Sequence, residues 1–173
     1  MIDISERAKK IKLLILDVDG VLTDGRIIYD SNGRDLKLFD VHDGLGVHLL
    51  RKMGIKTILI TAKNSKAIKP RAKDMHVEKV YGSIVPKTIV YDKILTEYKV
   101  KEEEVCFVGD DLVDIGIMKR VGLPISVPNA CQEIKDLSLY TTEKRGGRGA
   151  VREVAELILK SQGRWQEARE LYG

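Results

Sequence analysis

The stretch LLILDVDG, residues 13–20, constrains the fold of this chain more than any other. Its four leading aliphatic residues do not alternate with polar ones, which predicts a short strand covered on both faces in the middle of a parallel sheet. Burying an ionised carboxylate costs several kcal/mol unless a partner offsets that cost. Because Asp17 and Asp19 directly follow the strand, this end of the sheet is expected to carry a charged site.

Strand-like and helix-like segments alternate along the chain. Apolar residues at helical spacing predict helices over 43–53, 86–98 and 112–121. Short apolar runs predict strands over the ranges 12–17, 56–61, 79–83, 105–110 and 123–127. This alternation is typical of the α/β class, in which a doubly wound, Rossmann-like parallel sheet has helices on both faces and binds ligands at the carboxyl ends of its strands.

Two segments depart from this alternation. Residues 26–39 alternate around Asn32-Gly33, which predicts a projecting β-hairpin with a type I′ turn. Pro70 interrupts a helix that would otherwise open near residues 64–65, so a short or kinked helix is expected there.

The composition excludes several classes of function. The net charge is +4 and the Lys and Arg residues are dispersed, whereas nucleic-acid binders more often cluster them with aromatic residues, so no nucleic-acid partner is expected. Without a long uncharged apolar run or a leader-like start, a cytoplasmic protein with no membrane association is expected. Cys106 and Cys131 lack metal-binding spacing and are expected to be reduced thiols. A length of 173 residues predicts one domain over 1–173, with a C-terminal tail over about 143–173.

A second acidic cluster follows another predicted strand. In GDDLVD, residues 109–114, Asp110 stands at the strand end and Asp114 lies one turn into the next helix. Both acidic clusters therefore reach the same edge of the sheet. Four carboxylates converging there repel one another unless a hard divalent cation binds, and a set of oxygen ligands suits Mg²⁺.

A hydroxyl and an ammonium group are expected at the same edge. Thr61 ends one predicted strand, and Lys87 lies in the helix predicted to begin at Pro86. Mg²⁺, a lysine and N–H donors around an aspartate are what phosphoryl transfer requires, because its catalysis is mostly positioning and charge neutralisation. One carboxylate can attack phosphorus and form an aspartyl-phosphate, and another can act as general acid and base.

These motifs resemble those of the haloacid dehalogenase-like phosphatase superfamily. DVDG is similar to its D-x-D motif and GDDLVD to its GDxxxD motif, while Thr61 and Lys87 match its second and third motifs in order and in position. The resemblance implies that Asp17 is the nucleophile and Asp19 the acid/base. It also implies a Mg²⁺ site formed by Asp17, the backbone carbonyl of Asp19 and Asp110, with Asp111 and Asp114 in support.

The spacing of the motifs indicates a branch without a cap domain. The hairpin alone separates the first motif from the next predicted helix, and the second and third motifs lie too close together to enclose a cap. A capless site accepts a bulky substrate or borrows a lid from another subunit. Residues 20–50 and 142–154 look like those of the 3-deoxy-D-manno-octulosonate 8-phosphate phosphatases. That branch implies a homotetramer with hairpins around its axis and each active site completed by the Gly-rich tail of a neighbouring subunit.

The same resemblance suggests which side chains contact a phosphorylated sugar acid. TAKN stands where the branch often has T-G-R, so Lys63 replaces an Arg and loses the planar fork that grips a carboxylate or phosphate at two points. Asp43 is expected to cap its own helix, with a second role toward the substrate. The tail arginines either lie in a solvated turn or bind an anion, and we expect the latter for Arg145, Arg148 and Arg152.

The resemblance therefore implies a Mg²⁺-dependent phosphomonoesterase that hydrolyses 3-deoxy-D-manno-octulosonate 8-phosphate, a step in lipopolysaccharide precursor synthesis. A nine-carbon sugar acid phosphate or a small metabolite is the alternative substrate. A catalytically inactive binding protein would lack one of the catalytic residues, and none is missing. A polynucleotide phosphatase would show a basic groove, which the dispersed charge does not favour.

Overall fold

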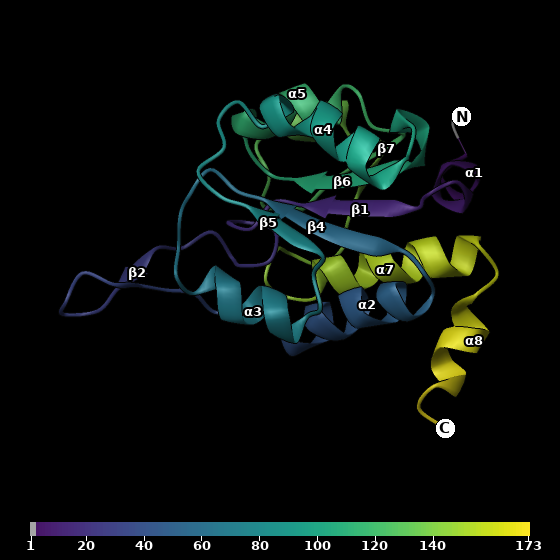
Figure 1. Cartoon of the computed structure of the whole chain (residues 1–173), viewed down its shortest axis with the longest axis horizontal. Coiled ribbons are helices and arrows are strands. Elements are labelled where there is room, and N and C mark those ends of the chain that lie inside the picture. The colour runs from purple at the N-terminus through teal and green to yellow at the C-terminus, as the bar shows by residue number, and fades with distance from the viewer. Residues whose placement is uncertain (1–2) are drawn as a thin grey trace.

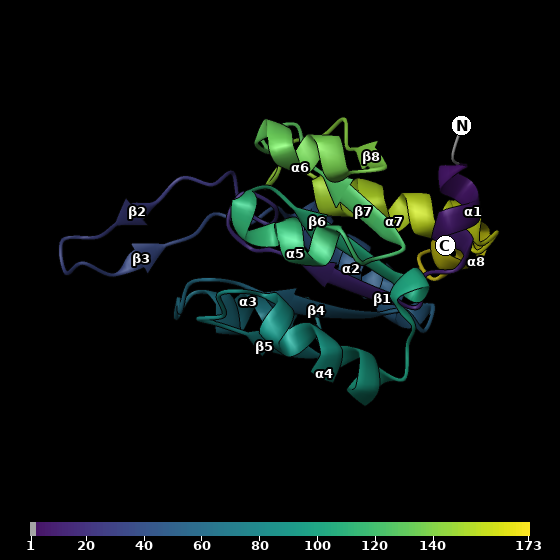
Figure 2. The same cartoon turned by 90° about the horizontal axis from the view of Figure 1, so that it is seen from above.

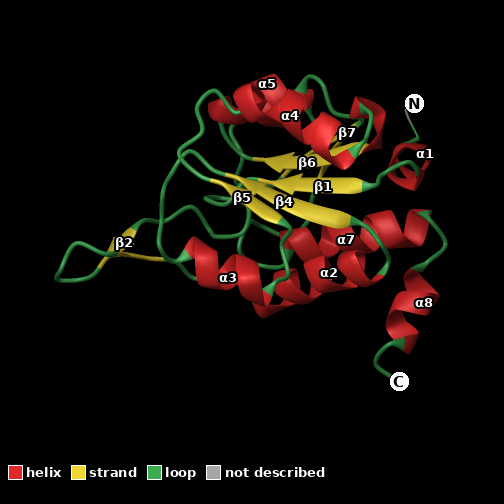
Figure 3. Ribbon diagram, in the orientation of Figure 1, coloured by secondary structure: helices red, strands yellow, loops and turns green. Residues whose placement is uncertain are grey.

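The computed structural model of the chain describes residues 3–173 and contains one parallel sheet covered by helices (Figures 1 and 3). Its six strands lie in the order β5-β4-β1-β6-β7-β8. The predicted α/β class and the five predicted strands are confirmed: each strand ends one or two residues before its predicted range does, and the first also begins one residue later. The strands are β1 (Leu13–Leu16), β4 (Lys56–Ile60), β5 (Lys79–Tyr81), β6 (Val105–Gly109), β7 (Leu123–Ser126) and β8 (Tyr140–Thr141).

Strand β1 lies near the centre of the sheet. Leu16 is in register with Leu59 of β4 on one side and with Val108 of β6 on the other. All four β1 residues are buried, as expected for a strand with neighbours on both sides and helices on both faces. The next residues along the chain are therefore delivered to the middle of the carboxyl edge.

Helices form a layer on each face of the sheet. In Figure 1, α4 (Thr88–Tyr98) and α5 (Ile115–Met118) cover one face. The other face is covered by α2 (Val41–Lys52), α3 (Ile68–Asp74) and α7 (Ala150–Ser161). Within residues 3–173, no helix is long and apolar enough to cross a membrane. The remaining helices are α1 (Ile4–Lys9), α6 (Gln132–Leu137), α8 (Trp165–Glu170) and the short 3₁₀ turns η1 (Glu102–Glu104) and η2 (Leu112–Asp114).

The segment interpreted from sequence as a tail contains the core helix α7. Its apolar side chains repeat at helical spacing and are fully buried, including Val151, Val154 and Ile158. The helix packs against α2, and its removal would expose the apolar surface of that neighbour. The predicted C-terminal tail is therefore wrong for the residues of α7, which belong to the folded body, and the description as a tail fits only the loop before α7.

Asp43 has a different structural role from the one predicted. Helix α2 is capped by Asp40, whose carboxylate accepts the N–H of His42 at 2.7 Å. The fully buried carboxylate of Asp43 instead accepts the N–H of Arg152 at 2.9 Å, in the first turn of α7. Such a contact satisfies a helix N–H that has no partner within its own helix. Asp43 thus joins α2 to α7.

The predicted hairpin is present, but its turn differs from the prediction. Strands β2 (Ile28–Tyr29) and β3 (Asp35–Leu36) project from the body at the carboxyl edge of the sheet (Figure 2). A type I′ turn needs a positive φ at both central residues, and only Gly33 of the Asn32-Gly33 pair has one, at +73°. Asp30 accounts for the difference, because its carbonyl accepts the N–H of Gly33 and its carboxylate accepts those of Asn32 and Arg34.

Helix α3 is short, as Pro70 predicts, but it begins later than the sequence suggested. It starts at Ile68, so that Pro70 falls in the first turn, where its missing N–H removes no bond of the helix. The three residues gained by the preceding loop lengthen the segment next to the projecting hairpin.

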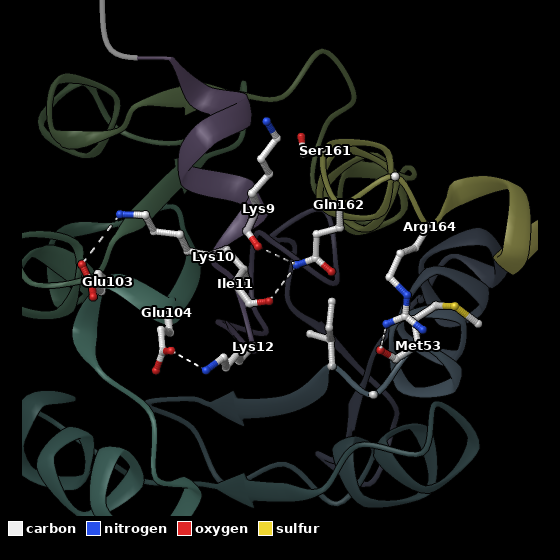
Figure 4. A pocket seen from close by; sticks show the side chains of 13 residues that line it. Lys9, Lys10, Ile11, Lys12, Met53, Glu103, Glu104, Ser161, Gln162 and Arg164 are labelled. Carbon is white, nitrogen blue, oxygen red and sulfur yellow. Dashed lines mark hydrogen bonds and ion pairs between the residues drawn. The ribbon is translucent and has the colours of Figure 1, made fainter.

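A cavity of about 900 Å³ lies at the opposite edge of the sheet, where the strands begin (Figure 4). Its polar groups already have partners: Gln162 donates to the carbonyl of Ile11 at 2.9 Å, and Lys12 pairs with Glu104 at 2.5 Å. The Arg164 guanidinium donates to the carbonyl of Met53. These contacts tie α1, α7 and α8 to the sheet, which indicates a structural role for this edge.

We expect Asp43→Ala to lower the free energy of unfolding by about 1 kcal/mol, because α7 loses its cap. Burial raises the pKa of the Asp43 carboxyl from 3.8 to about 6, so the folded state holds that proton more tightly than the unfolded chain does. Its contribution to stability therefore falls as pH rises from about 4 to about 6, and then levels off. Denaturant unfolding across this range measures both effects.

Asp43→Asn is the matched control, because it keeps an acceptor and removes the titration. Its stability should rise relative to the unmodified protein as pH increases from about 4 to about 6. A stability difference that does not change with pH would contradict the buried titration.

Candidate active site

The four predicted motifs converge at the carboxyl edge of the sheet. Asp17 follows β1, Thr61 follows β4 and Asp110 follows β6, so three neighbouring strands each deliver one polar side chain. They share a cavity of about 290 Å³. Its remaining lining residues are Asp19, Gly25, Ala62, Lys63, Asp111 and Val113.

A buried lysine bridges two of the carboxylates. Lys87 directly precedes α4, and its Nζ lies 2.6 Å from Oδ1 of Asp17 and 2.6 Å from Oδ1 of Asp114. Burial disfavours the ammonium form, but the carboxylates of Asp17 and Asp114 outweigh it and raise the pKa of Lys87 above its usual value. Lys87 is therefore a permanent cation at the centre of the site.

Asp114 connects the second acidic loop to Lys87. Its Oδ1 is bound to Lys87, and its Oδ2 accepts the backbone N–H of Asp110 at 2.9 Å. Asp111 turns away from this cluster, because its carboxylate accepts the N–H of Leu112 at 2.8 Å and caps η2. Of the two supporting carboxylates predicted from sequence, Asp114 lies within the cluster, whereas Asp111 lines the cavity from the loop.

The carboxylate of Asp110 packs directly on the backbone of the first acidic loop. Gly20 has φ of +87°, and a Cβ at that position would lie 1.8 Å from Oδ2 of Asp110. Only glycine fits both the backbone conformation and the contact. Gly20 therefore permits the close approach of the two acidic loops.

Burial, together with the close approach of other acids, raises the pKa values of Asp17 and Asp110. Burial, partly opposed by Lys87, raises the pKa of Asp17 to about 6. Burial, followed by repulsion from Asp17 and Asp114, raises the pKa of Asp110 to about 8. The uncompensated negative charge is what a bound cation would neutralise.

The geometry of the cluster fits Mg²⁺. Carboxylate oxygens of Asp17, Asp110 and Asp114 all lie within 4.8 Å of one another, and each is a hard ligand. Because both oxygens of Asp114 already have partners, Asp17 and Asp110 are the side chains best placed to bind the ion directly.

Two polar residues at the site were missed by sequence reasoning. Lys37, from the end of the hairpin, contacts Oδ1 of Asp19. The amide of Asn129 donates to the carbonyl of Gly20 at 2.8 Å and accepts the N–H of Gly146 at 2.9 Å. Neither residue belongs to a motif, and a lysine in an otherwise exposed hairpin is typical of a solvated surface. No pattern in a single sequence indicates these contacts.

The Gly-rich loop before α7 lies on the catalytic loop of its own chain. The N–H of Gly147 donates to the carbonyl of Val21 at 2.9 Å, and a Cβ on Gly146 would lie 1.7 Å from the carbonyl oxygen of Gly20. The sequence interpretation brings this segment to a neighbouring subunit. In the single chain, its glycines support the first acidic loop.

The predicted substrate-binding residues are dispersed. Lys63 lines the cavity, Arg145 is exposed, and Arg148 lines a separate hollow beside Asp24 and His42. Arg152 was predicted to contact substrate, but its guanidinium bonds to Glu156 at 2.9 Å and lies over the Trp165 ring at 5.5 Å. Within the single chain, Arg152 and Asp43 thus pack away from the cavity, and a contact of Arg152 with the substrate of a neighbouring subunit stays a prediction.

Comparison with known proteins agrees with this geometry. Residues 43–122 match the haloacid dehalogenase-like hydrolase family, a range that includes Thr61, Lys87 and the second acidic loop. The chain is 39% identical over 167 residues to the 3-deoxy-D-manno-octulosonate 8-phosphate phosphatase of Escherichia coli strain K12, covering 96% of this chain and 89% of that protein. The chain belongs to the haloacid dehalogenase-like hydrolases.

Solved structures resemble this hydrolase over nearly its whole length. One is the 3-deoxy-D-manno-octulosonate 8-phosphate phosphatase of Moraxella catarrhalis in complex with magnesium ion, phosphate ion and KDO, with a TM-score of 0.95, 38% identity and 98% of each chain covered. Another is the cobalt-bound deoxy-D-mannose-octulosonate 8-phosphate phosphatase of Haemophilus influenzae, with a TM-score of 0.87, 32% identity and 91% and 92% coverage. The predicted absence of a cap agrees with this match.

We expect Mg²⁺ to bind this hydrolase more tightly as pH rises from about 6 to about 8. The raised pKa values of Asp17 and Asp110 mean that the metal-free site holds protons in this range, and the ion must displace them. Calorimetric titration in buffers of different ionisation enthalpy measures both the affinity and the protons released.

Asp110→Asn is the control for this measurement, because it removes the carboxyl with the highest of these pKa values. It should bind Mg²⁺ more weakly and release fewer protons on binding. An affinity that is constant between about pH 6 and 8 in the unmodified protein would contradict the protonated metal-free site.

Proposed function

We propose that this hydrolase is a Mg²⁺-dependent phosphatase that converts 3-deoxy-D-manno-octulosonate 8-phosphate to the free sugar acid and inorganic phosphate. The observation that carries the proposal is the buried Lys87 held between Asp17 and Asp114, next to a cavity that Asp17 and Asp19 line. The substrate assignment is supported by the relatives named above, which match nearly the whole chain.

The first chemical step uses the carboxylate oxygen of Asp17 that Lys87 does not hold. Lys87 holds Oδ1, which leaves Oδ2 to attack phosphorus. As the bond between Oδ2 and phosphorus forms, the ester P–O bond breaks, and protonated Asp19 gives its proton to the departing sugar oxygen. Mg²⁺, when bound by Asp17, the Asp19 carbonyl and Asp110, neutralises charge on the phosphoryl oxygens.

The second step returns the site to its starting state. Asp19, now a carboxylate, takes a proton from a water molecule as the water oxygen bonds to phosphorus. The acyl-phosphate P–O bond breaks, so that inorganic phosphate leaves and the Asp17 carboxylate is regenerated. Lys87 neutralises charge on Asp17 in both steps, because its ammonium stays at hydrogen-bond distance from Oδ1.

The size of the cavity limits what part of a substrate it holds. A volume of about 290 Å³ suits a phosphoryl group and the adjacent carbon atoms. Lys63 also lines a second cavity of about 850 Å³ along the hairpin, which is where the rest of a sugar acid would lie in this proposal. In this proposal Lys63, Arg145 and Arg148 are the cations available to the substrate carboxylate.

A homotetramer that buries the hairpin is part of the proposal. Five apolar side chains on or beside the hairpin are 39–65% exposed in the single chain, namely Ile27, Ile28, Tyr29, Leu36 and Leu38. An apolar patch of this kind is typical of an interface. A cytoplasmic location is also proposed, because both cysteines, Cys106 and Cys131, are free thiols.

Phosphate release from a panel of sugar acid phosphates, with and without Mg²⁺, tests the proposed reaction. We expect 3-deoxy-D-manno-octulosonate 8-phosphate to exceed a nine-carbon analogue and small sugar phosphates by at least about tenfold in kcat/KM. Asp17→Asn should abolish turnover, because an amide cannot form the acyl-phosphate, while leaving the unfolding transition intact.

Two results of this experiment would reject different parts of the proposal. Mg²⁺-dependent activity that is equal on all members would reject the substrate and keep the phosphatase chemistry. Substantial turnover by Asp17→Asn would reject the nucleophile.

The assembly is tested by the double variant Ile28→Ser, Leu36→Ser, which removes one cross-strand apolar pair of the hairpin. We expect a mass of four chains for the unmodified protein and of one or two chains for the variant, as measured by light scattering. Leu171→Ser, an exposed apolar residue after α8, is the control and should not change the mass. An unchanged mass in the double variant would contradict a hairpin interface.

A further inference from the structure

The hairpin contains one buried cation among exposed residues. Its apolar side chains face outward, and Arg34 is 72% exposed beside Asp30. The side chain of Lys37, which directly follows β3, is only 5% exposed. Its Nζ lies 2.5 Å from Oδ1 of Asp19 and 3.7 Å from Oδ2 of Asp35. The buried end of the hairpin therefore reaches the catalytic cavity.

Lys37 supplies a cation that Asp19 otherwise lacks. Lys87 is fully engaged with Asp17 and Asp114. Within residues 3–173, the hydrogen-bonding partner of the Asp19 carboxylate is Lys37. Because no other residue within 3–173 bonds to the Asp19 carboxyl group, loss of Lys37 would leave that group able to rotate out toward solvent. Each aspartate of the D-x-D motif thus has its own lysine: Lys87 contacts Asp17, and Lys37 contacts Asp19.

We propose that Lys37 is a positioning residue that holds the Asp19 carboxyl group over the cavity, so that the hairpin takes part in catalysis as well as in assembly. This inference rests on the proposed phosphatase function. Lys37 acts through Asp19, whose carboxyl must lie within hydrogen-bond reach of the ester oxygen in the first step and of the attacking water in the second.

The position of Lys37 depends on how the hairpin is held. The hairpin extends well beyond the body of the domain (Figure 2), and its exposed apolar side chains are far better covered by another protein surface than by water. Whatever covers them also fixes the direction from which Lys37 reaches Asp19. Assembly and the placement of Asp19 are therefore coupled through one side chain.

The decisive comparison uses two phosphate esters that differ in the need for a general acid. An alkyl phosphate has a poor leaving group, whereas 2,4-dinitrophenyl phosphate releases a stable anion that needs no proton. Both esters still need Asp19 to activate water in the second step. A loss of Asp19 positioning should therefore slow both steps for the alkyl ester and only the second step for the dinitrophenyl ester.

Lys37→Met is the test variant. We expect kcat on the alkyl phosphate to fall about a hundredfold, at the lower end of what general acid–base catalysis contributes. KM should stay within about threefold of the unmodified value, as expected when binding is retained. On 2,4-dinitrophenyl phosphate, the variant should release one equivalent of dinitrophenolate rapidly and then turn over slowly, and stopped-flow absorbance detects this burst.

Two further variants distinguish a role of Lys37 in positioning Asp19 from a role in folding. Lys37→Arg keeps the charge and should recover at least about tenfold of the lost kcat. Arg26→Met changes an exposed hairpin cation that pairs with Asp24, and it should leave kcat within about twofold. All three variants should keep the unfolding transition and the solution mass of the unmodified protein.

The outcomes that overturn the inference are distinct from those that overturn the function. An unchanged kcat in Lys37→Met, or an equal loss on both esters without a burst, would overturn the positioning role. Unmodified protein that hydrolyses 2,4-dinitrophenyl phosphate but no sugar acid phosphate would overturn only the substrate. Unmodified protein that hydrolyses no phosphate ester with Mg²⁺ would overturn the phosphatase function and the role of Lys37 with it.

Discussion

The charged cluster formed by Lys87, Asp17 and Asp114 is the interaction on which the rest of the site depends. All three side chains are almost completely buried, so each charge needs the others. The cluster joins the end of β1, the start of α4 and the loop after β6, which are far apart along the chain. The residues that give the site its chemistry are therefore also the ones that hold three segments together at the carboxyl edge of the sheet.

Close backbone contacts at two glycines also hold the acidic loops together. Gly20 allows Asp110 to pack against the first acidic loop, and Gly146 allows a later loop to pack against Gly20 in turn. Asn129 binds both glycines, while the N–H of Cys131 in the same turn donates to the carbonyl of Asp110. One turn after β7 thus sets the separation of the two acidic loops.

Sequence patterns predicted the parts of this molecule that depend on local chemistry. The apolar runs fixed five strands, and the strand-end positions of Asp17, Thr61 and Asp110 follow directly from a parallel sheet. The patterns failed where long-range contacts decide the outcome. Asp43 caps a helix more than 100 residues away in sequence, Lys37 reaches Asp19 across the hairpin, and the Gly-rich segment leads into a core helix. Single-sequence periodicity carries no information on such partners.

The packing of the Gly-rich loop on the first acidic loop has a consequence for synthesis on the ribosome. The Asp17–Gly20 segment is made before its backbone partners at 146–147 and the helix that anchors them, which follow all the strands of the sheet. Until α7 has left the exit tunnel, α2 lacks its apolar neighbour and the two acidic loops lack their support. The nascent chain is therefore expected to acquire its active site only after α7 has emerged, long after the first acidic loop has been made.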